Sequence, residues 1–192
     1  MPSPYDDDLW RLVPEEPGPP PARLAAFVER LGRAGAALDL GCGDGRLSAL
    51  LDADELTLAD VSEVALARAA RRLPGARAVA LQPDAPLPLA DNAFDLVLCA
   101  ETIEHVRDVQ LLLSEARRVL RPGGRLAIAT PAHSRLTGFD ILARGLERRF
   151  PPLSPHLRFL TRRSLRALLE DLGFEPGEVR RSRGALLAVA RR

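Results

Sequence analysis

Two glutamates and one histidine occupy positions 101, 104 and 105, directly after a predicted buried strand. A helix that began at the exit of that strand would place Glu101, Glu104 and His105 on one face, because residues three and four apart lie on the same side of a helix. Carboxylates and an imidazole that converge there could bind a divalent cation or act as a general base. Further along the chain, His156 offers another imidazole. We therefore take Glu101, His105 and His156 as catalytic candidates, and these three with Glu104 as candidate metal ligands; helix packing is the alternative role for His105.

A glycine-rich loop, LDLGCGDG at 38–45, follows the first predicted strand and opens the next helical stretch. Glycines allow the backbone to turn tightly and to approach a ligand, and a helix N-terminus adds partial positive charge. The dinucleotide fingerprint G-x-G-x-x-G requires a small residue where this chain has Arg46. The loop therefore favours a ligand without a pyrophosphate, and it disfavours a nicotinamide-dependent oxidoreductase.

Two aspartates follow the next two predicted strands. Asp60 ends the second strand at a distance of about 20 residues from the glycines, where a carboxylate can accept hydrogen bonds from a ribose diol. Asp84 follows the third strand, beside Pro83, and could bind an amino group such as that of adenine. A simple turn is the alternative role for Asp84, because aspartate is common in turns.

An alternation of short apolar strands with amphipathic helices positions these residues. Five strands that alternate with helices predict a parallel sheet that is covered on both faces and binds its ligand at the carboxyl ends of the strands. Two late strands are close enough in sequence to pair as a hairpin. The predicted strands are 36–40, 55–60, 77–81, 94–99, 125–130, 174–180 and 185–190, and the predicted helices are 22–31, a short helix that ends near 51, 62–72, 102–120, 136–149 and 161–172.

Residues 1–21 form a proline-rich segment ahead of the single domain that we predict for 22–192. Because of the prolines we expect neither a regular helix nor a central strand in this segment. Tyr5 and Trp10 are the only tyrosine and tryptophan of the chain, and both lie in it. A disordered tail rarely carries both, so we expect part of the segment to pack on the domain, as a candidate lid over a bound ligand.

Length and composition exclude several classes of protein. The 192 residues suffice for one domain with a substantial core. No apolar run approaches the roughly 18 residues of a membrane span, and the N-terminus does not resemble a signal peptide, so we expect a cytoplasmic protein. Two cysteines are too few for a disulfide framework. Arginine supplies all 27 basic residues, so lysine chemistry is excluded, and a net charge of +1 disfavours bulk binding of nucleic acid despite the arginines that gather after position 135.

The order of the motifs resembles that of class I methyltransferases that depend on S-adenosylmethionine (SAM), of the type 11 and type 23 kind. The resemblance rests on LDLGCGDG, LAD, QPDAPLPLADNAFDLVLCAETIEHV, LRPGGRLAIATP and LTRRSLRALLEDLGF, which together cover nearly all of 38–174. It implies an α/β fold: a Rossmann-like, seven-stranded, mostly parallel sheet flanked by helices, with the last strand antiparallel in a C-terminal hairpin. It also implies a cofactor site with Asp39, Gly41 and Gly43 near the methionine part of SAM, Asp60 at the ribose, and Asp84 with Ala85 at the adenine; Cys42, Val61 and Ala100 complete the predicted set.

The segment around 101–105 also resembles the Glu-x-x-Glu-His element of ubiquinone-pathway O-methyltransferases and of small-RNA 2′-O-methyltransferases. In those families the cluster binds magnesium, whereas similar sequences occur in SAM methyltransferases that use no metal. A divalent cation such as magnesium is therefore a candidate second cofactor.

We expect SAM-dependent transfer of a methyl group to a small-molecule acceptor, most directly to a hydroxyl oxygen, with nitrogen and carbon acceptors next. The alternatives are an RNA 2′-O-methyltransferase, which the arginine-rich C-terminal third favours, and a non-catalytic SAM-binding protein. DNA and membrane-spanning partners are not expected, and the chain is expected to be a monomer or a homodimer.

Overall fold

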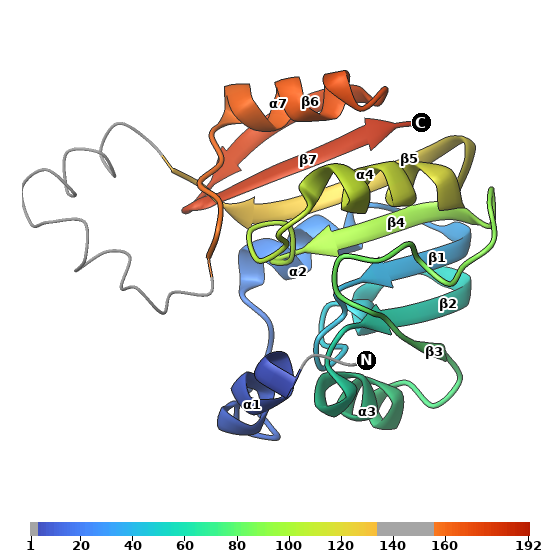
Figure 1. Cartoon of the computed structure of the whole chain (residues 1–192), viewed down its shortest axis with the longest axis vertical. Coiled ribbons are helices and arrows are strands. Elements are labelled where there is room, and N and C mark those ends of the chain that lie inside the picture. Colours follow the sequence, from blue (N-terminus) through green and yellow to red (C-terminus); the bar gives the residue numbers. More distant parts are fainter. Residues whose placement is uncertain (1–3, 134–155) are drawn as a thin grey trace, which may run out of the picture.

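A seven-stranded sheet forms the centre of the fold in the computed structural model, which describes residues 4–133 and 156–192 (Figure 1). The strand order is β3-β2-β1-β4-β5-β7-β6; β7 runs antiparallel to both of its neighbours, and the other pairs are parallel. The predicted fold class, with its C-terminal hairpin, is confirmed. The strands are β1 Ala34–Leu40, β2 Ala53–Asp60, β3 Arg77–Ala80, β4 Phe94–Ala100, β5 Leu120–Pro131, β6 Glu175–Ser182 and β7 Ala185–Arg191, and the helices are α1 Pro4–Leu12, α2 Ala22–Glu29, the 3-10 helix η1 Ser48–Leu50, α3 Glu63–Arg72, α4 Val109–Val119 and α7 Arg162–Asp171.

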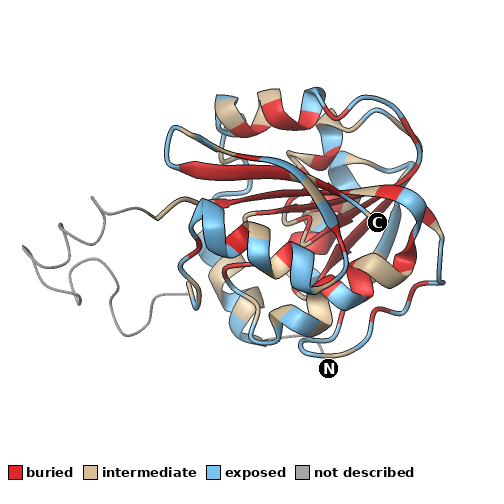
Figure 2. Cartoon of the chain, turned by 90° about the horizontal axis from the view of Figure 1, so that it is seen from above, coloured by how far each residue is buried: buried red, intermediate tan, exposed pale blue. Residues whose placement is uncertain are grey.

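Helices cover the two faces of the central strands, which are apolar along nearly their whole length. On one face, Leu24, Phe27 and Val28 of α2 pack with buried residues of β1, β4 and β5. On the other face, α4 and α7 contribute Leu113 and Leu165 to a larger cluster. Each such side chain contributes about 1.5–3 kcal/mol when it is fully buried. Figure 2 shows the buried strands between helices whose outer faces are exposed. Within the described residues, no helix is long and apolar enough to cross a membrane.

The predicted helix 161–172 matches α7, and side chains at its two ends explain where it starts and stops. The Thr161 hydroxyl accepts a hydrogen bond from the backbone N–H of Ser164, and the Ser164 hydroxyl in turn accepts one from the N–H of Thr161. This reciprocal capping box satisfies two N–H groups that a helix leaves unpaired. Gly173 follows the helix with a φ of +76°, the left-handed conformation that glycine adopts without strain.

The predicted helix 102–120 was wrong in its first third, because α4 begins only at Val109. Residues 101–108 form turns instead. Glu101 has a φ of +53°, which no residue of a right-handed helix can have, and the Asp108 carboxylate caps α4 by accepting a hydrogen bond from the N–H of Leu111. Glu101, Glu104 and His105 therefore do not share a helix face.

The expectation of no regular helix in 1–21 was also wrong, since α1 spans Pro4–Leu12. After its first residue this helix contains no proline, and the next proline is Pro14. Asp6 and Asp7 lie in the first turn and Arg11 in the last, which is the charge order that the helix dipole favours. The predicted helix 136–149 lies outside the described residues.

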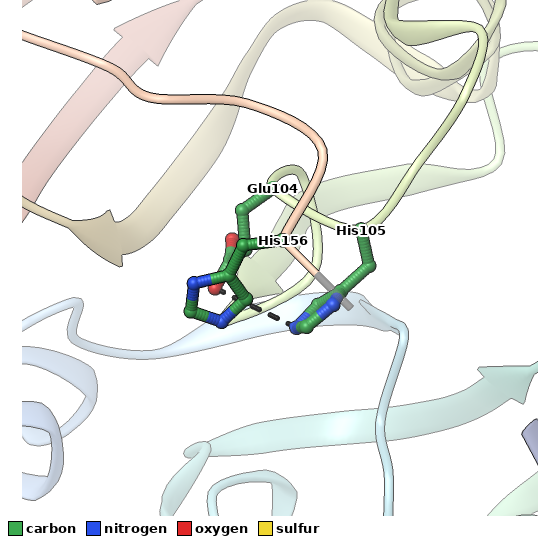
Figure 3. Close-up of side chains that lie close together, drawn as sticks. All are labelled: Glu104, His105 and His156. Atoms are coloured by element: carbon green, nitrogen blue, oxygen red, sulfur yellow. Dashed lines mark ion pairs between the residues drawn. The ribbon is translucent and has the colours of Figure 1, made fainter. Parts of the chain in front are cut away.

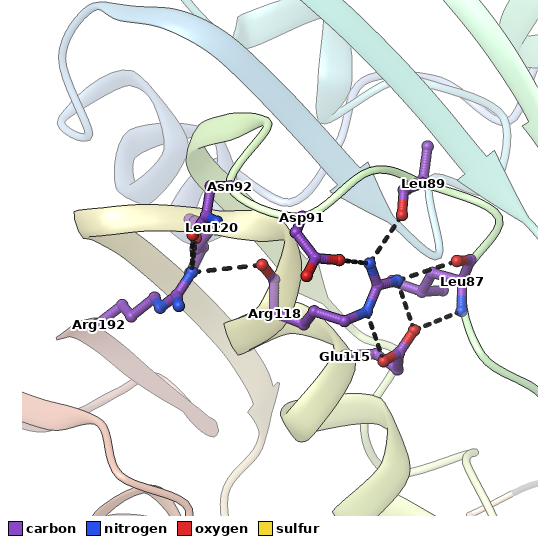
Figure 4. Close-up of polar contacts among 8 residues, drawn as sticks. All are labelled: Leu87, Leu89, Asp91, Asn92, Glu115, Arg118, Leu120 and Arg192. Atoms are coloured by element: carbon purple, nitrogen blue, oxygen red, sulfur yellow. Dashed lines mark hydrogen bonds and ion pairs between the residues drawn. The ribbon is translucent and has the colours of Figure 1, made fainter.

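A half-buried arginine, Arg118, links the loop between β3 and β4 to α4 (Figure 4). Arg118 donates hydrogen bonds to the backbone carbonyls of Leu87 and Leu89, at 3.0 and 2.8 Å. Its guanidinium also pairs with the carboxylates of Glu115 and Asp91, and Glu115 accepts a hydrogen bond from the N–H of Leu87 at 2.7 Å. The pairing with Arg118 lowers the pKa of Glu115, so both groups are charged near neutral pH.

Replacing this arginine should destabilise the fold. In Arg118→Met the two loop carbonyls and the Glu115 carboxylate lose their donor, and unpaired polar groups of this kind cost about 1–3 kcal/mol. Urea unfolding should detect the loss. Arg77→Met, which removes an exposed arginine from the edge strand β3, should change the free energy of unfolding by less than about 0.5 kcal/mol. Equal stability of the two variants would contradict the structural role of Arg118.

Candidate functional site

Most of the predicted site residues gather at the carboxyl edge of the sheet. Asp39 lies near the end of β1, Asp60 ends β2, and Ala100 ends β4. Asp39 pairs in register with Leu58 of β2 and Leu98 of β4, so the three strands finish side by side. The loops that leave these strands are therefore close together, as expected for parallel strands.

The glycine loop that follows β1 requires glycine for two reasons. Gly41 and Gly43 have φ values of +81° and +54°, in the left-handed region that side chains rarely adopt. A Cβ atom at Gly41 would also lie 2.3 Å from the Thr102 Oγ1 atom, and one at Gly43 would lie 2.8 Å from the Trp10 Cζ2 atom. The backbone thus approaches both neighbours more closely than any side chain would permit.

Asp60 joins this loop to the start of α3. Its two carboxylate oxygens accept hydrogen bonds from the N–H groups of Gly43, at 2.8 Å, and Ser62, at 2.9 Å. The side chain is buried, with 7% of the residue exposed. Burial raises the pKa of Asp60, and the nearby Asp6 carboxylate raises it further.

Asp39 is a second buried carboxyl group at this edge. It accepts a hydrogen bond of 2.6 Å from the Ser48 hydroxyl. Burial raises the pKa of Asp39 to about 7. Burial likewise raises the pKa of Cys42 and of Cys99, which keeps both thiols protonated and makes them poor nucleophiles.

The helix α1 covers this part of the edge. The sequence analysis expected contacts of the N-terminal segment with the domain but no helix in it. The Trp10 indole lies against Gly43, and the Asp7 carboxylate accepts hydrogen bonds from the Ser62 hydroxyl and the Val64 N–H, at 2.7 and 3.2 Å. The expectation that part of the N-terminal segment packs on the domain is thus met. Its signal in the sequence was Trp10, the single tryptophan of the chain.

Asp84 follows β3 and is exposed to solvent. It accepts a long hydrogen bond of 3.4 Å from the N–H of Asp108 and lies 4.0 Å from the Arg107 guanidinium. These residues and Arg158 line an open pocket of about 530 Å³. Ala85 and Val61, also predicted to bind the cofactor, are half-buried.

Glu104, His105 and His156 form a compact cluster (Figure 3). The atoms that each could offer to a ligand lie within 4.8 Å of one another, and the two imidazole rings meet edge to face with centroids 4.9 Å apart. Glu104 is buried and accepts a hydrogen bond of 2.9 Å from the Thr130 hydroxyl, while its backbone carbonyl accepts one from the N–H of Leu157. The latter contact holds the segment that carries His156 against the 101–108 turns.

Glu101 lies outside that group of three donors but is electrostatically coupled to it. Burial raises the pKa of Glu101 to about 7, and the Glu104 carboxylate adds to this rise. Burial also raises the pKa of Glu104. Burial lowers the pKa of His156, and the neighbouring His105 lowers it further. The His156 imidazole is therefore uncharged at neutral pH. An uncharged imidazole beside carboxyl groups can accept a proton.

The sequence therefore identified the members of this edge but not their arrangement. The i, i+3, i+4 spacing predicted one helix face, whereas the structure uses a turn and brings His156 in from the segment before α7. Thr130, which donates a hydrogen bond to Glu104, was not among the predicted site residues. It is the penultimate residue of the buried strand β5, where its polarity is the only signal in the sequence.

Comparison with known proteins places the chain among methyltransferases. A methyltransferase-domain family matches residues 38–128. Malonyl-[acyl-carrier protein] O-methyltransferase of Methylococcus capsulatus is 35% identical over 164 residues, which are 82% of this chain and 53% of that protein. Ubiquinone biosynthesis O-methyltransferase of Sinorhizobium fredii is 38% identical over 102 residues, 48% of this chain and 40% of that protein. The chain thus spans about half the length of these relatives.

Solved structures share the fold at lower sequence identity. An S-adenosylmethionine-dependent methyltransferase from Mesorhizobium loti has a TM-score of 0.66 at 22% identity and covers 93% of this chain and 98% of its own. A SAM-dependent methyltransferase from Aquifex aeolicus has a TM-score of 0.65 at 22% identity, with 90% and 93% covered. These likenesses establish the architecture.

Proposed function

Because the chain carries a class I SAM-dependent methyltransferase domain, we propose that it transfers the methyl group of SAM to a small-molecule acceptor, most directly to a hydroxyl oxygen. The observation that carries the choice of oxygen is the cluster of Glu104, His105 and His156 at the carboxyl edge of the sheet. A hydroxyl must lose its proton when it is methylated, and an uncharged imidazole at that edge can take it.

We propose that SAM lies along the edge from the glycine loop to Asp84. Asp39, Gly41, Cys42 and Gly43 would face its methionine part, Asp60 and Val61 its ribose, and Asp84 and Ala85 its adenine, with Ala100 at the exit of β4. The order of these residues along the edge supports this assignment, since β1, β2 and β3 are neighbours in the sheet. The Asp60 carboxylate already accepts hydrogen bonds from two N–H groups and would accept others from the ribose hydroxyls.

Transfer follows from alignment and proton removal. The acceptor oxygen forms a bond to the methyl carbon while the carbon–sulfur bond breaks, and the electron pair of that bond stays on sulfur in S-adenosylhomocysteine (SAH). The acceptor proton passes to the His156 imidazole. Alignment of two bound reactants supplies about 7–11 kcal/mol in favourable cases, and a general base adds about 10²- to 10⁴-fold in rate.

The cofactor assignment can be tested at Asp60. We expect Asp60→Ala to raise the Kd for SAH at least about tenfold, because a charge-assisted hydrogen bond contributes about 1.5–3 kcal/mol. Asp52→Ala, which removes an exposed aspartate beside the start of β2 at the opposite edge of the sheet, should leave the Kd unchanged. Calorimetry measures both. An unchanged Kd in Asp60→Ala would remove the ribose assignment, and no SAH binding by the wild-type chain would remove the proposed function.

A divalent cation is a second candidate for activation of the acceptor. One carboxylate oxygen of Glu104 is buried and has no hydrogen-bond partner within the described residues. An oxygen in this state is available to bind a metal ion. Glu104, His105 and His156 would hold the ion, which would lower the pKa of the acceptor hydroxyl. One carboxylate with two imidazoles suits a first-row transition ion better than magnesium, which prefers oxygen ligands.

Chelation separates the two candidates. For the base mechanism we expect wild-type turnover of a hydroxyl acceptor to persist in excess EDTA, and His156→Asn to lower kcat by about 10²- to 10⁴-fold. SAH affinity, measured in the same samples, should not change in either case. Loss of turnover with EDTA, followed by recovery with Mn²⁺, would overturn the base mechanism in favour of the cation.

We also propose that α1 is a movable cover on the cofactor site. It contacts the domain through the Asp7 carboxylate, which accepts hydrogen bonds from the Ser62 hydroxyl and the Val64 N–H, and through the Trp10 indole, which lies against Gly43. The ribose of a bound cofactor must reach Asp60, which is only 7% exposed in the structure, where α1 covers this edge. Access therefore requires α1 to shift.

The single tryptophan makes this cover observable. Binding of SAH should change the emission intensity or wavelength of Trp10, because the indole must leave or rearrange its contact with Gly43. Fluorescence titration should give the same Kd as calorimetry. Emission that stays constant while calorimetry reports saturation would contradict the movement of α1.

A further inference from the structure

The segment 156–160, which carries His156 into the histidine cluster, forms neither a helix nor a strand. Hydrogen bonds of a helix or a sheet therefore do not fix its position, which depends on contacts made by individual residues. The first of these contacts is made by the backbone. The Leu157 N–H donates a hydrogen bond of 2.7 Å to the Glu104 carbonyl, one residue before His105.

The second contact is made by the side chain of Arg158, which is half-buried. Its Nη1 atom donates to the backbone carbonyl of Val106 and its Nη2 atom to that of Arg107, on the other side of His105. A guanidinium is planar and holds its N–H groups in a rigid arrangement, so one arginine can bind two successive carbonyls in a fixed direction. Hydrogen bonds thus join the segment that carries His156 to the chain both before and after His105.

These two contacts together determine how the imidazole rings face each other. The single hydrogen bond of Leu157 would still allow the segment to turn about that bond. The hydrogen bonds of Arg158 oppose such a turn, because their acceptors lie further along the 101–108 turns. The rings of His105 and His156, which come from different segments, then meet edge to face with centroids 4.9 Å apart (Figure 3).

We propose that Arg158 is a positioning residue, which orients His156 toward His105 and Glu104 without taking part in the chemistry itself. The consequence for catalysis rests on the proposed function, whereas the orientation of the rings does not. The same orientation is needed whether His156 takes the proton of the acceptor or helps to bind a cation. A displacement of about 1 Å in such a site can lower the rate about 10²-fold. Loss of the Arg158 guanidinium should therefore affect turnover although this side chain does not act on the acceptor.

The contact between the two rings can be measured by NMR in the ligand-free protein. The chain has three histidines, so their ring C–H signals can be assigned with the variants His105→Gln and His156→Asn. We expect a nuclear Overhauser effect between the ring protons of His105 and His156 in the wild type, and its loss in Arg158→Met. Arg162→Met, which removes an exposed arginine from the first turn of α7, is the matched control and should keep the effect.

Turnover and a conservative variant complete the test. With the hydroxyl acceptor of the chelation experiment, Arg158→Met should lower kcat by about 10- to 100-fold and leave the KM for the acceptor nearly unchanged. Arg158→Lys keeps the charge and the aliphatic stem but lacks the planar guanidinium, so we expect it to lose the ring contact as well. Urea unfolding shows whether each variant is folded, and Arg158→Lys decides the question if Arg158→Met does not fold.

Three results would overturn the inference. The first is an intact ring contact in a folded variant at Arg158, and the second is the absence of this contact from the wild type. The third is loss of the contact with an unchanged kcat, which would restrict Arg158 to a role in the fold. Failure of the wild type to bind SAH would instead remove the proposed function, and the NMR comparison would still decide whether Arg158 orients the two rings.

Discussion

The hydrogen bonds of the Asp60 carboxylate hold the candidate site together. One oxygen accepts from the N–H of Gly43 and the other from the N–H of Ser62, so a single buried side chain fixes the glycine loop relative to the start of α3. Ser62 in turn caps α3 through the N–H of Ala65 and donates to Asp7 of α1. Hydrogen bonds to a charged acceptor are shorter and about twice as strong as neutral ones. Three segments that are far apart in the sequence thus depend on one carboxylate.

The same edge concentrates negative charge. Asp39, Asp60, Glu101 and Glu104 all lie at or just after the carboxyl ends of strands, and burial raises the pKa of each. The Asp60 carboxylate raises the pKa of Asp39 further, and the Glu104 carboxylate raises that of Glu101, because like charges in a poorly solvated site repel. A ligand with positive charge relieves that repulsion. SAM has a sulfonium and an ammonium group, and the sulfonium charge disappears on methyl transfer, so the proposed site would favour SAM over SAH.

The sequence predicted the strands, their alternation with the helices that cover the sheet, and the glycine loop. These follow from short-range patterns of apolar residues and turns. It failed where tertiary contacts decide the local conformation. Glu101 belongs to a stretch with helical spacing, yet its φ of +53° ends the strand in a turn, and Asp108 starts the helix seven residues later. The helix α1 was not predicted because the N-terminal segment is rich in proline as a whole, whereas the residues between Pro4 and Pro14 contain none. His156 reaches the cluster through the contact of Leu157 with Glu104, which no sequence pattern encodes.

The two ends of the proposed cofactor site differ in how firmly they are held. The loop that carries Asp84 is fixed through Arg118, which bonds to two backbone carbonyls and two carboxylates at once. If the loop opened, the carbonyls of Leu87 and Leu89 and the Glu115 carboxylate would lose their hydrogen bonds to Arg118. Opening of the loop is therefore costly. In contrast, α1 contacts the domain through the Asp7 carboxylate, which accepts from Ser62 and Val64, and through Trp10 on Gly43, and its C-terminal end leaves Leu12 exposed. Contacts of this kind can be exchanged at low cost. In the proposed site the adenine end would therefore be rigid, and α1 would be the element that moves when the cofactor is exchanged.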